Sequence, residues 1–256
     1  MMKTTLILTS FCVILHTCIQ AQSTRNISLR YKTDSSSKAV LLSNLMPDAV
    51  GNASPYIGTA YWTDNNHELE CRSLLTFDLG SLTFLIKPEQ VVRATLILEP
   101  VQPGAVNPNH TNKFIVRRVT TEWEDTLTTW NNQPEFATND EVIKKVPADK
   151  ADETVKVNVT DILKNMIRYG NNGFLLCFPP REEVAATASK WFASGKNENV
   201  TYRPVLQVDF YVRNAVNPNF PTSPLIEVVE RQNQRKVPAT TPSTMIDGKA
   251  VPIPDH

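Results

Sequence analysis

Two adjacent aromatic residues open the stretch of the chain whose residue types best suit ligand binding. Tyr61 and Trp62 are followed within a few positions by His67, and the residues between them are mostly polar. We interpret this stretch as a surface loop, where exposed aromatic side chains are costly unless they have a use. Tyr61, Trp62 and His67 are therefore the first candidates for ligand-binding residues.

The polar residues of the same stretch offer oxygen atoms to a cation. Asp64, Asn65 and Glu68 carry the carboxylate and amide oxygens that Ca²⁺ accepts as ligands. The dense alternation of Asp residues that is typical of calcium loops is absent, so these three are weak calcium candidates. We expect no cofactor and no metal, with Ca²⁺ as the alternative.

Basic residues bracket a second stretch and suit an anionic ligand. Lys113 and Arg117, with Arg118 beside it, flank an apolar run that resembles a strand. Arginine pairs with carboxylates through two parallel hydrogen bonds, so these side chains are candidates for contact with uronate groups. Ordinary surface charges on a solvated strand explain them equally well, and the strand phase leaves open which arginine points outward.

The residues that catalysis needs are sparse. Residues 122–125 include three carboxylates, but side chains so close in sequence rarely flank a sugar ring, as glycoside hydrolysis requires. A lyase would need a base such as His67 or Tyr61 beside a cation such as Arg72. No G-x-S-x-G, H-E-x-x-H or C-x-x-C motif occurs. We therefore expect no enzymatic activity, and a polysaccharide lyase is the least favoured alternative.

Strands must position most of these residues, because alternating apolar residues dominate from about residue 39 to residue 212. Half-buried strands are predicted where apolar and polar residues alternate, over 73–79, 94–98, 155–159 and 206–212. The run 173–178 is apolar throughout, which is typical of a central strand covered on both faces.

One amphipathic helix interrupts the strands. It is predicted over 162–169, with Thr160 or Asp161 as its cap and Gly170 after its end. Many strands with one short helix predict an all-β fold, namely an antiparallel β-sandwich of the jelly-roll type.

Composition divides the chain into three parts. Residues 1–21 combine a positive start, a short apolar run and a small residue before the expected cut, as in a secretory signal peptide. Lipid attachment at Cys18 is the disfavoured alternative. Residues 22–213 are predicted to form one domain. Residues 214–256 are rich in proline and are predicted to be mostly extended or disordered, with one short strand near 225–229.

Export and charge limit the classes of function. We expect a secreted protein that is extracellular, periplasmic or held at the cell surface, because no other stretch is long enough to span a bilayer. The 26 basic and 26 acidic residues give a net charge of zero, which argues against binding to nucleic acid. The hydrophobic fraction of 41% is sufficient for a packed core.

Two cysteines, Cys71 and Cys177, remain once the signal peptide is removed. An even pair in an oxidising compartment permits one disulfide. Both residues also lie in apolar runs, where free cysteines are commonly buried. The sequence leaves both interpretations open.

Four segments, in order along the chain, resemble the signatures of one family. They are Ile57–Gly58 with Arg72–Leu79 and Val92–Leu98, then Val119–Pro134, then Val157–Leu163 with Tyr169–Phe174, and last Phe192–Ser194 with Arg203–Val208. The second segment contains a Trp-Asn-x-x-Pro block and is the most specific. The segments resemble the DNRLRE domain family, also classed as carbohydrate-binding module family 96, although the hexapeptide behind the first name does not occur here.

The resemblance implies a single β-sandwich and a non-catalytic role, either attachment to polysaccharide, including polyuronates, or a cell-surface building block. We therefore hypothesise a secreted carbohydrate-binding module that attaches to extracellular or cell-surface polysaccharide. The alternative is a structural or adhesive surface protein that binds protein partners, with the tail as one docking segment.

The resemblance also bears on two tryptophans. Trp123 and Trp130 flank the acidic residues 122–125, an arrangement that would suit stacking on a sugar. Their block is the family's structural signature, and a tryptophan in a long connection commonly closes the edge of a sandwich with its N–H bonded to backbone. We interpret Trp123, Trp130 and Asn131 as structural.

Overall fold

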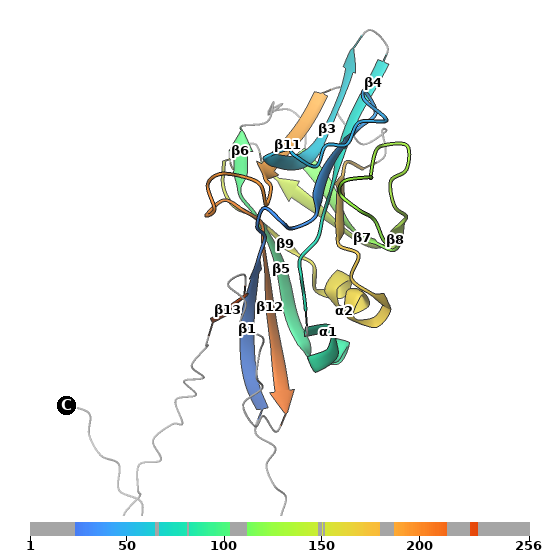
Figure 1. Ribbon diagram of the computed structural model, residues 1–256. Coiled ribbons are helices and arrows are strands. Elements are labelled where there is room, and N and C mark those ends of the chain that lie inside the picture. The colour runs from blue at the N-terminus through green and yellow to red at the C-terminus, as the bar shows by residue number, and fades with distance from the viewer. Residues whose placement is uncertain are drawn as a thin grey trace, which may run out of the picture.

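In the part of the chain that it describes, the computed structural model is dominated by antiparallel strands. The described residues are 24–64, 67–80, 82–102, 112–147, 150, 152–179, 187–213 and 226–229. Within them, antiparallel strands form two sheets with a shared core between them (Figure 1). The prediction of an all-β fold of the β-sandwich class is confirmed.

The smaller sheet has five strands among the described residues. In order across the sheet they are β13 (Ile226–Val229), β1 (Thr24–Lys32), β12 (Val205–Arg213), β5 (Val91–Leu98) and β9 (Val155–Asn158). Alternation along the strands places apolar side chains such as Leu29, Leu96 and Val208 in the core between the sheets. The predicted runs of period two near 94–98, 155–159 and 206–212 correspond to β5, β9 and β12.

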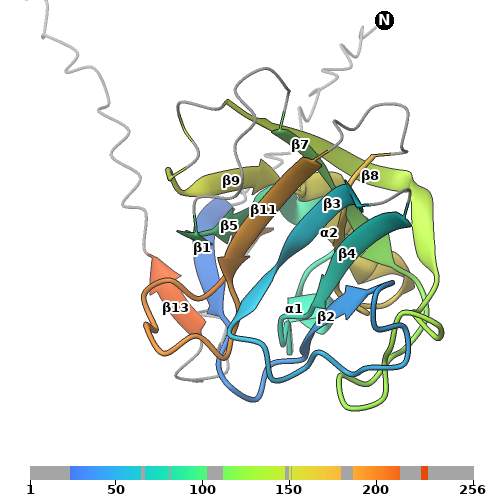
Figure 2. The same cartoon turned by 90° about the horizontal axis from the view of Figure 1, so that it is seen from above.

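The larger sheet has eight strands in the described part of the chain. Seven follow one another as β6 (Pro100–Gln102), β11 (Thr187–Ala193), β3 (Tyr56–Asp64), β4 (His67–Leu75), β10 (Phe174–Cys177), β7 (Asn112–Val119) and β8 (Phe136–Val146). The eighth, β2 (Ala39–Ser43), pairs with β4, as Figure 2 shows from above. The run predicted as a strand over 73–79 leaves the ladder after Leu75, although Phe77 and Leu79 stay buried in the core.

Two α-helices lie in the described residues, where the sequence predicts one. The predicted helix is α2 (Thr160–Tyr169), and Gly170 follows it as expected. Its predicted side-chain cap is wrong: the helix starts at Thr160, whose hydroxyl accepts a hydrogen bond from the Ala94 N–H at 3.0 Å instead. The second helix, α1 (Leu82–Leu85), and the 3₁₀ turn η1 (Pro88–Gln90) are too short to leave a periodic signal.

Strand β10 is buried on both faces, as its continuous apolar sequence predicts. Phe174 and Leu176 belong to the core between the sheets, whereas Leu175 and Cys177 belong to a second apolar cluster on the outer face of the larger sheet. Gly173 precedes the strand with φ of +87°, and a Cβ there would lie 2.4 Å from the Leu75 carbonyl oxygen. Only glycine therefore allows β10 to approach β4 so closely.

Residues 120–135, here called the covering segment, bury this outer cluster. The segment connects β7 to β8, and its Trp123 packs on the cluster with 7% of its surface exposed. The indole Nε1 of Trp123 donates a hydrogen bond to the backbone oxygen of Asn172 at 2.8 Å. The segment thus shields apolar side chains that a two-layer sandwich would leave in water.

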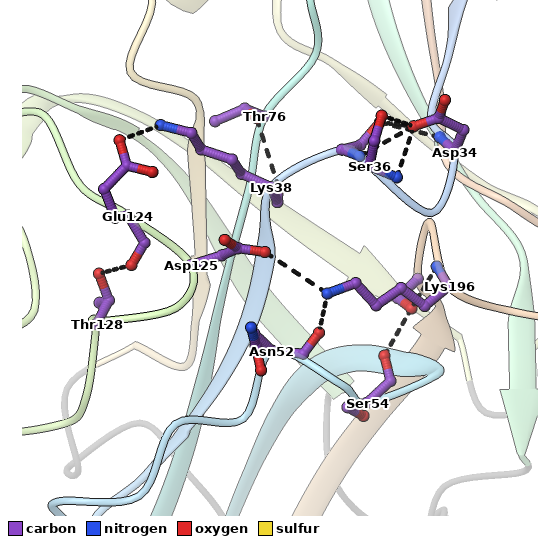
Figure 3. A network of polar contacts seen from close by, with 12 residues as sticks. Asp34, Ser36, Lys38, Asn52, Ser54, Thr76, Glu124, Asp125, Thr128 and Lys196 are labelled. Atoms are coloured by element: carbon purple, nitrogen blue, oxygen red, sulfur yellow. Dashed lines mark hydrogen bonds and ion pairs between the residues drawn. The ribbon is translucent and has the colours of Figure 1, made fainter.

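Two lysines hold the covering segment in place (Figure 3). Lys38 Nζ lies 2.7 Å from the Glu124 carboxylate. The same Nζ also donates a hydrogen bond to the Trp123 carbonyl oxygen. Lys196 Nζ lies 3.5 Å from the Asp125 carboxylate and donates to the Asn52 carbonyl oxygen. These contacts connect the segment to parts of the chain that are distant in sequence.

Cys71 and Cys177 are free, buried thiols, so the disulfide that the sequence left open is not formed. The sheet register explains why. Ser73 lies opposite Leu176, so Cys71 shares the face of Ser73 while Cys177 lies on the face of Leu175. The two side chains point to opposite faces of the sheet.

Most of the two terminal segments lies outside the described residues. This holds for the expected signal peptide, residues 1–21, and for the tail apart from β13, which pairs with β1 close to the predicted position. Within the described part of the chain, no helix has the length and apolar character needed to cross a membrane.

Burial should keep both thiols unreactive in the folded protein. Burial raises the pKa of Cys177 to about 11 and also raises the pKa of Cys71. We expect negligible reaction with Ellman's reagent at pH 8, and two thiols per chain after unfolding without reductant in the variant Cys12→Ser/Cys18→Ser. Fewer than two thiols in the unfolded variant would contradict the free pair.

The Trp123 hydrogen bond should stabilise the covering segment. In Trp123→Phe the Asn172 carbonyl loses its indole partner, so we expect the free energy of unfolding to fall by about 1–3 kcal/mol. Trp62→Phe is the control, because Trp62 lies in β3 and outside this segment. Urea denaturation followed by far-ultraviolet circular dichroism measures both, and equal stability of the two variants would refute this role.

Candidate functional site

A cavity of about 280 Å³, here called the sheet cavity, opens on the larger sheet near the end of β10. Its lining residues come from five strands and the residues after β10, namely Tyr61, Glu68, Glu70, Arg72, Arg117, Phe136, Cys177, Phe178 and Pro179. Strands widely separated in sequence therefore contribute aromatic rings, guanidinium groups and carboxylates to one small space.

The aromatic pair at 61–62 lies on a strand and not in a loop. β3 and β4 form a hairpin in which Asp64 pairs with His67, so the connection is only two residues long. Neighbouring strand residues point to opposite faces, which separates Tyr61 from Trp62. Tyr61 lines the cavity with 7% of its surface exposed, whereas half-buried Trp62 and exposed His67 do not line it.

Arg72 is fixed by contacts from its own strand and from the covering segment. Its Nε lies 2.6 Å from Glu70 Oε1, and its Nη1 donates to Gln133 Oε1 at 3.2 Å. The guanidinium carbon lies 4.8 Å from the centre of the Trp130 ring. The covering segment therefore sets the orientation of this cavity residue.

Arg117 is held in a similar way on the other side of the cavity. Its Nε and Nη2 lie 2.8 Å and 2.7 Å from Glu141 Oε2, and its guanidinium carbon lies 5.2 Å from the Phe136 ring centre. A guanidinium has five N–H donors, so Arg72 and Arg117 each retain donors beyond these contacts.

The register settles which arginine of β7 faces the cavity. Arg117 lies opposite Leu175 of the outer cluster, whereas Arg118 lies opposite Phe174 of the core. Arg118 accordingly turns to the other face, where its Nε lies 2.7 Å from Asp140 Oδ2. The register therefore decides the strand phase that the sequence left open, and it places Arg117 on the outer face.

The electrostatics of the cavity combine two cations with three carboxylates. Arg117 and Arg72 both lie close enough to Cys177 to oppose the rise in its pKa, whose main cause is burial. Glu68 and Glu70 line the cavity as well. Glu141 lies outside the lining and forms an ion pair with Arg117. The site carries no excess of positive charge.

The remaining binding and metal candidates lie elsewhere. Lys113 is half-buried on β7 opposite Lys145 and does not line the cavity. Of the weak calcium candidates, Glu68 lines it, while Asn65 and the side chain of Asp64 lie outside the described residues. In the described ranges, no group of three or more His, Cys, Asp and Glu side chains could hold a metal ion.

The residues interpreted as structural lie in the covering segment. Trp130 is half-buried under Arg72, and Asn131 bonds to a neighbouring loop through its backbone N–H on the Pro47 oxygen and its Nδ2 on Asp48 Oδ1. Trp123 points into the outer cluster and not toward the sheet cavity.

Sequence reasoning missed several residues that line the cavity or contact its arginines. Glu70 carried a usable signal, because it stands two positions before Arg72 on a strand and therefore shares its face. Phe136 and Glu141 carried none, since the register of β8 against β7 brings them to Arg117. Rings and hydrogen-bonding groups together suit a ligand with apolar faces and many hydroxyl groups.

Comparison with known families matches one family model to the chain, described as carbohydrate-binding module family 96, over residues 57–210. The match covers more than half of the chain and includes the motif segments between Ile57 and Val208. No curated protein matches the chain. The chain belongs to carbohydrate-binding module family 96.

Proposed function

We propose that this chain is an exported, non-catalytic module that attaches to polysaccharide through the sheet cavity. The observation that carries the proposal is the convergence of Tyr61, Arg72, Arg117 and Phe136 on one small cavity in a chain of this family. Aromatic rings offer apolar faces to sugar rings, and fixed guanidinium and carboxylate groups offer hydrogen bonds to hydroxyls.

The charges around the cavity favour an uncharged polymer over a polyuronate. A uronate carboxylate would have to compete with Glu70 for Arg72 and with Glu141 for Arg117. Glu68 adds a further negative charge on the cavity wall. Hydroxyl groups meet no such repulsion, because they donate to carboxylates and accept from guanidinium groups.

The same contacts support a role without catalysis. Glu70 and Glu141 are each bound to an arginine, so neither is free to act as a general acid or nucleophile in the observed geometry. Of the two bases considered for a lyase, His67 lies at the hairpin end, away from the cavity lining, whereas Tyr61 lines the cavity together with Arg72.

Affinity electrophoresis tests the proposed site. We expect gels that contain xylan or a mixed-linkage β-glucan to retard the protein, and alginate gels to retard it less or not at all. Arg117→Met should lose most of the retardation, by roughly tenfold in affinity, because it removes hydrogen-bond donors from the cavity. Arg93→Met is the control, since Arg93 is exposed on the smaller sheet.

Three results would count against parts of the proposal. Unchanged mobility of the unmodified protein with every polymer would contradict polysaccharide binding. Strong retardation by alginate that is lost in Arg117→Met would support the sheet cavity as the binding site. It would also show that the ligand is a polyuronate and not a neutral polymer. Equal losses in Arg117→Met and Arg93→Met would move the site away from the sheet cavity.

A further inference from the structure

We infer that a second cleft, at the start of the covering segment, is a further binding site for the hydroxyl groups of a neutral sugar. This inference rests on the proposed function, because it assigns a second site to the same polymer. The cleft, here called the edge cleft, has a volume of about 570 Å³ and shares no lining residue with the sheet cavity.

Four short stretches of chain build the edge cleft. They are residues 36–38 before β2, 76–78 after β4, 122–124 of the covering segment and 171–172 before β10. The cleft therefore lies where β4 and β10 leave the ladder, at the end opposite to the sheet cavity.

Hydrogen bonds tie these walls to one another. Trp123 Nε1 donates to the Asn172 oxygen at 2.8 Å, and Asn171 Nδ2 donates to the Phe77 oxygen at 2.9 Å. Lys38 joins a third wall through its ion pair with Glu124. Because the walls are joined in the unbound chain, a ligand would not have to assemble the cleft.

The cleft offers more hydrogen-bond acceptors than donors. Asp78 uses one carboxylate oxygen to accept from the Gly80 N–H, and exposed Glu122 makes no hydrogen bond or ion pair with any described residue. Lys38, the cation of the cleft, is already engaged by Glu124 and a backbone oxygen. A matching ligand must therefore donate hydrogen bonds, as sugar hydroxyls do, and a polyanion is disfavoured.

The two sites are close enough for one polymer to gain from both. Arg72 of the sheet cavity and Thr76 of the edge cleft are four residues apart along one extended stretch, which corresponds to about 13 Å. When one site holds a polymer, the other meets it at a raised effective concentration, so loss of either site weakens binding by on the order of tenfold or more.

The test uses one exposed residue of the cleft and a matched control. Glu122→Ala removes an unengaged carboxylate from the cleft, whereas Glu135→Ala removes an exposed carboxylate of the same segment that lines neither site. Both are compared with the unmodified protein in xylan and β-glucan gels, and melting temperatures confirm that both fold. We expect roughly tenfold weaker binding in Glu122→Ala and no change in Glu135→Ala.

The outcomes separate this inference from the proposed function. If Arg117→Met loses binding while Glu122→Ala binds like the unmodified protein, the edge cleft is not a sugar site and the sheet cavity stands. If the unmodified protein binds neither polymer, both proposals fail. Binding to chitosan, an amine-bearing polymer, that Glu122→Ala removes would replace the neutral sugar by a cationic one and overturn the assigned ligand class.

Discussion

The larger sheet is apolar on its outer face along β2, β4, β10 and β7, and this imposes the main constraint on the structure. Val40, Leu42, Leu74 and Leu175 lie there, each with at most 1% of its surface exposed. A side chain of this kind contributes about 1.5–3 kcal/mol when it is fully buried. The face must therefore be covered, and the segment between β7 and β8 covers it.

This covering links stability to the proposed function. Trp123 anchors the start of the segment on the Asn172 oxygen, and the Lys38 and Lys196 contacts hold it from two sides. Further along the segment, Trp130 and Gln133 contact Arg72. The edge cleft lies at the start of the covering segment and the sheet cavity lies near its end. The positions of the polar groups in both therefore depend on the packing of this segment.

Much of the fold was predictable from local patterns. Period-two alternation identified β5, β9 and β12, and the apolar run over 173–178 correctly indicated a strand covered on both faces. β8 was missed because its side chains are mostly exposed or half-buried, which leaves little apolar alternation to read. The supposed loop at Tyr61 was wrong, since a two-residue connection makes a tight hairpin even where the flanking residues are polar.

The candidate site was less predictable because it depends on register between distant strands. Arg117 was named from its charge, but its neighbours Arg72, Phe136 and Glu141 come from strands whose alignment is set by packing. The face of Cys71 relative to Cys177 is likewise a property of the β4–β10 register and cannot be read from either cysteine alone.

The proposed function assigns sugar binding in the sheet cavity to Arg72 and Arg117. Arginine Nε–Hε resonances, followed by nuclear magnetic resonance during titration with a neutral oligosaccharide of the polymer selected by the gels, test it most directly. Binding in the sheet cavity should shift the resonances of Arg72 and Arg117 and leave that of Arg118, on the opposite face, unchanged. Saturable binding that leaves both cavity arginines unshifted would contradict it.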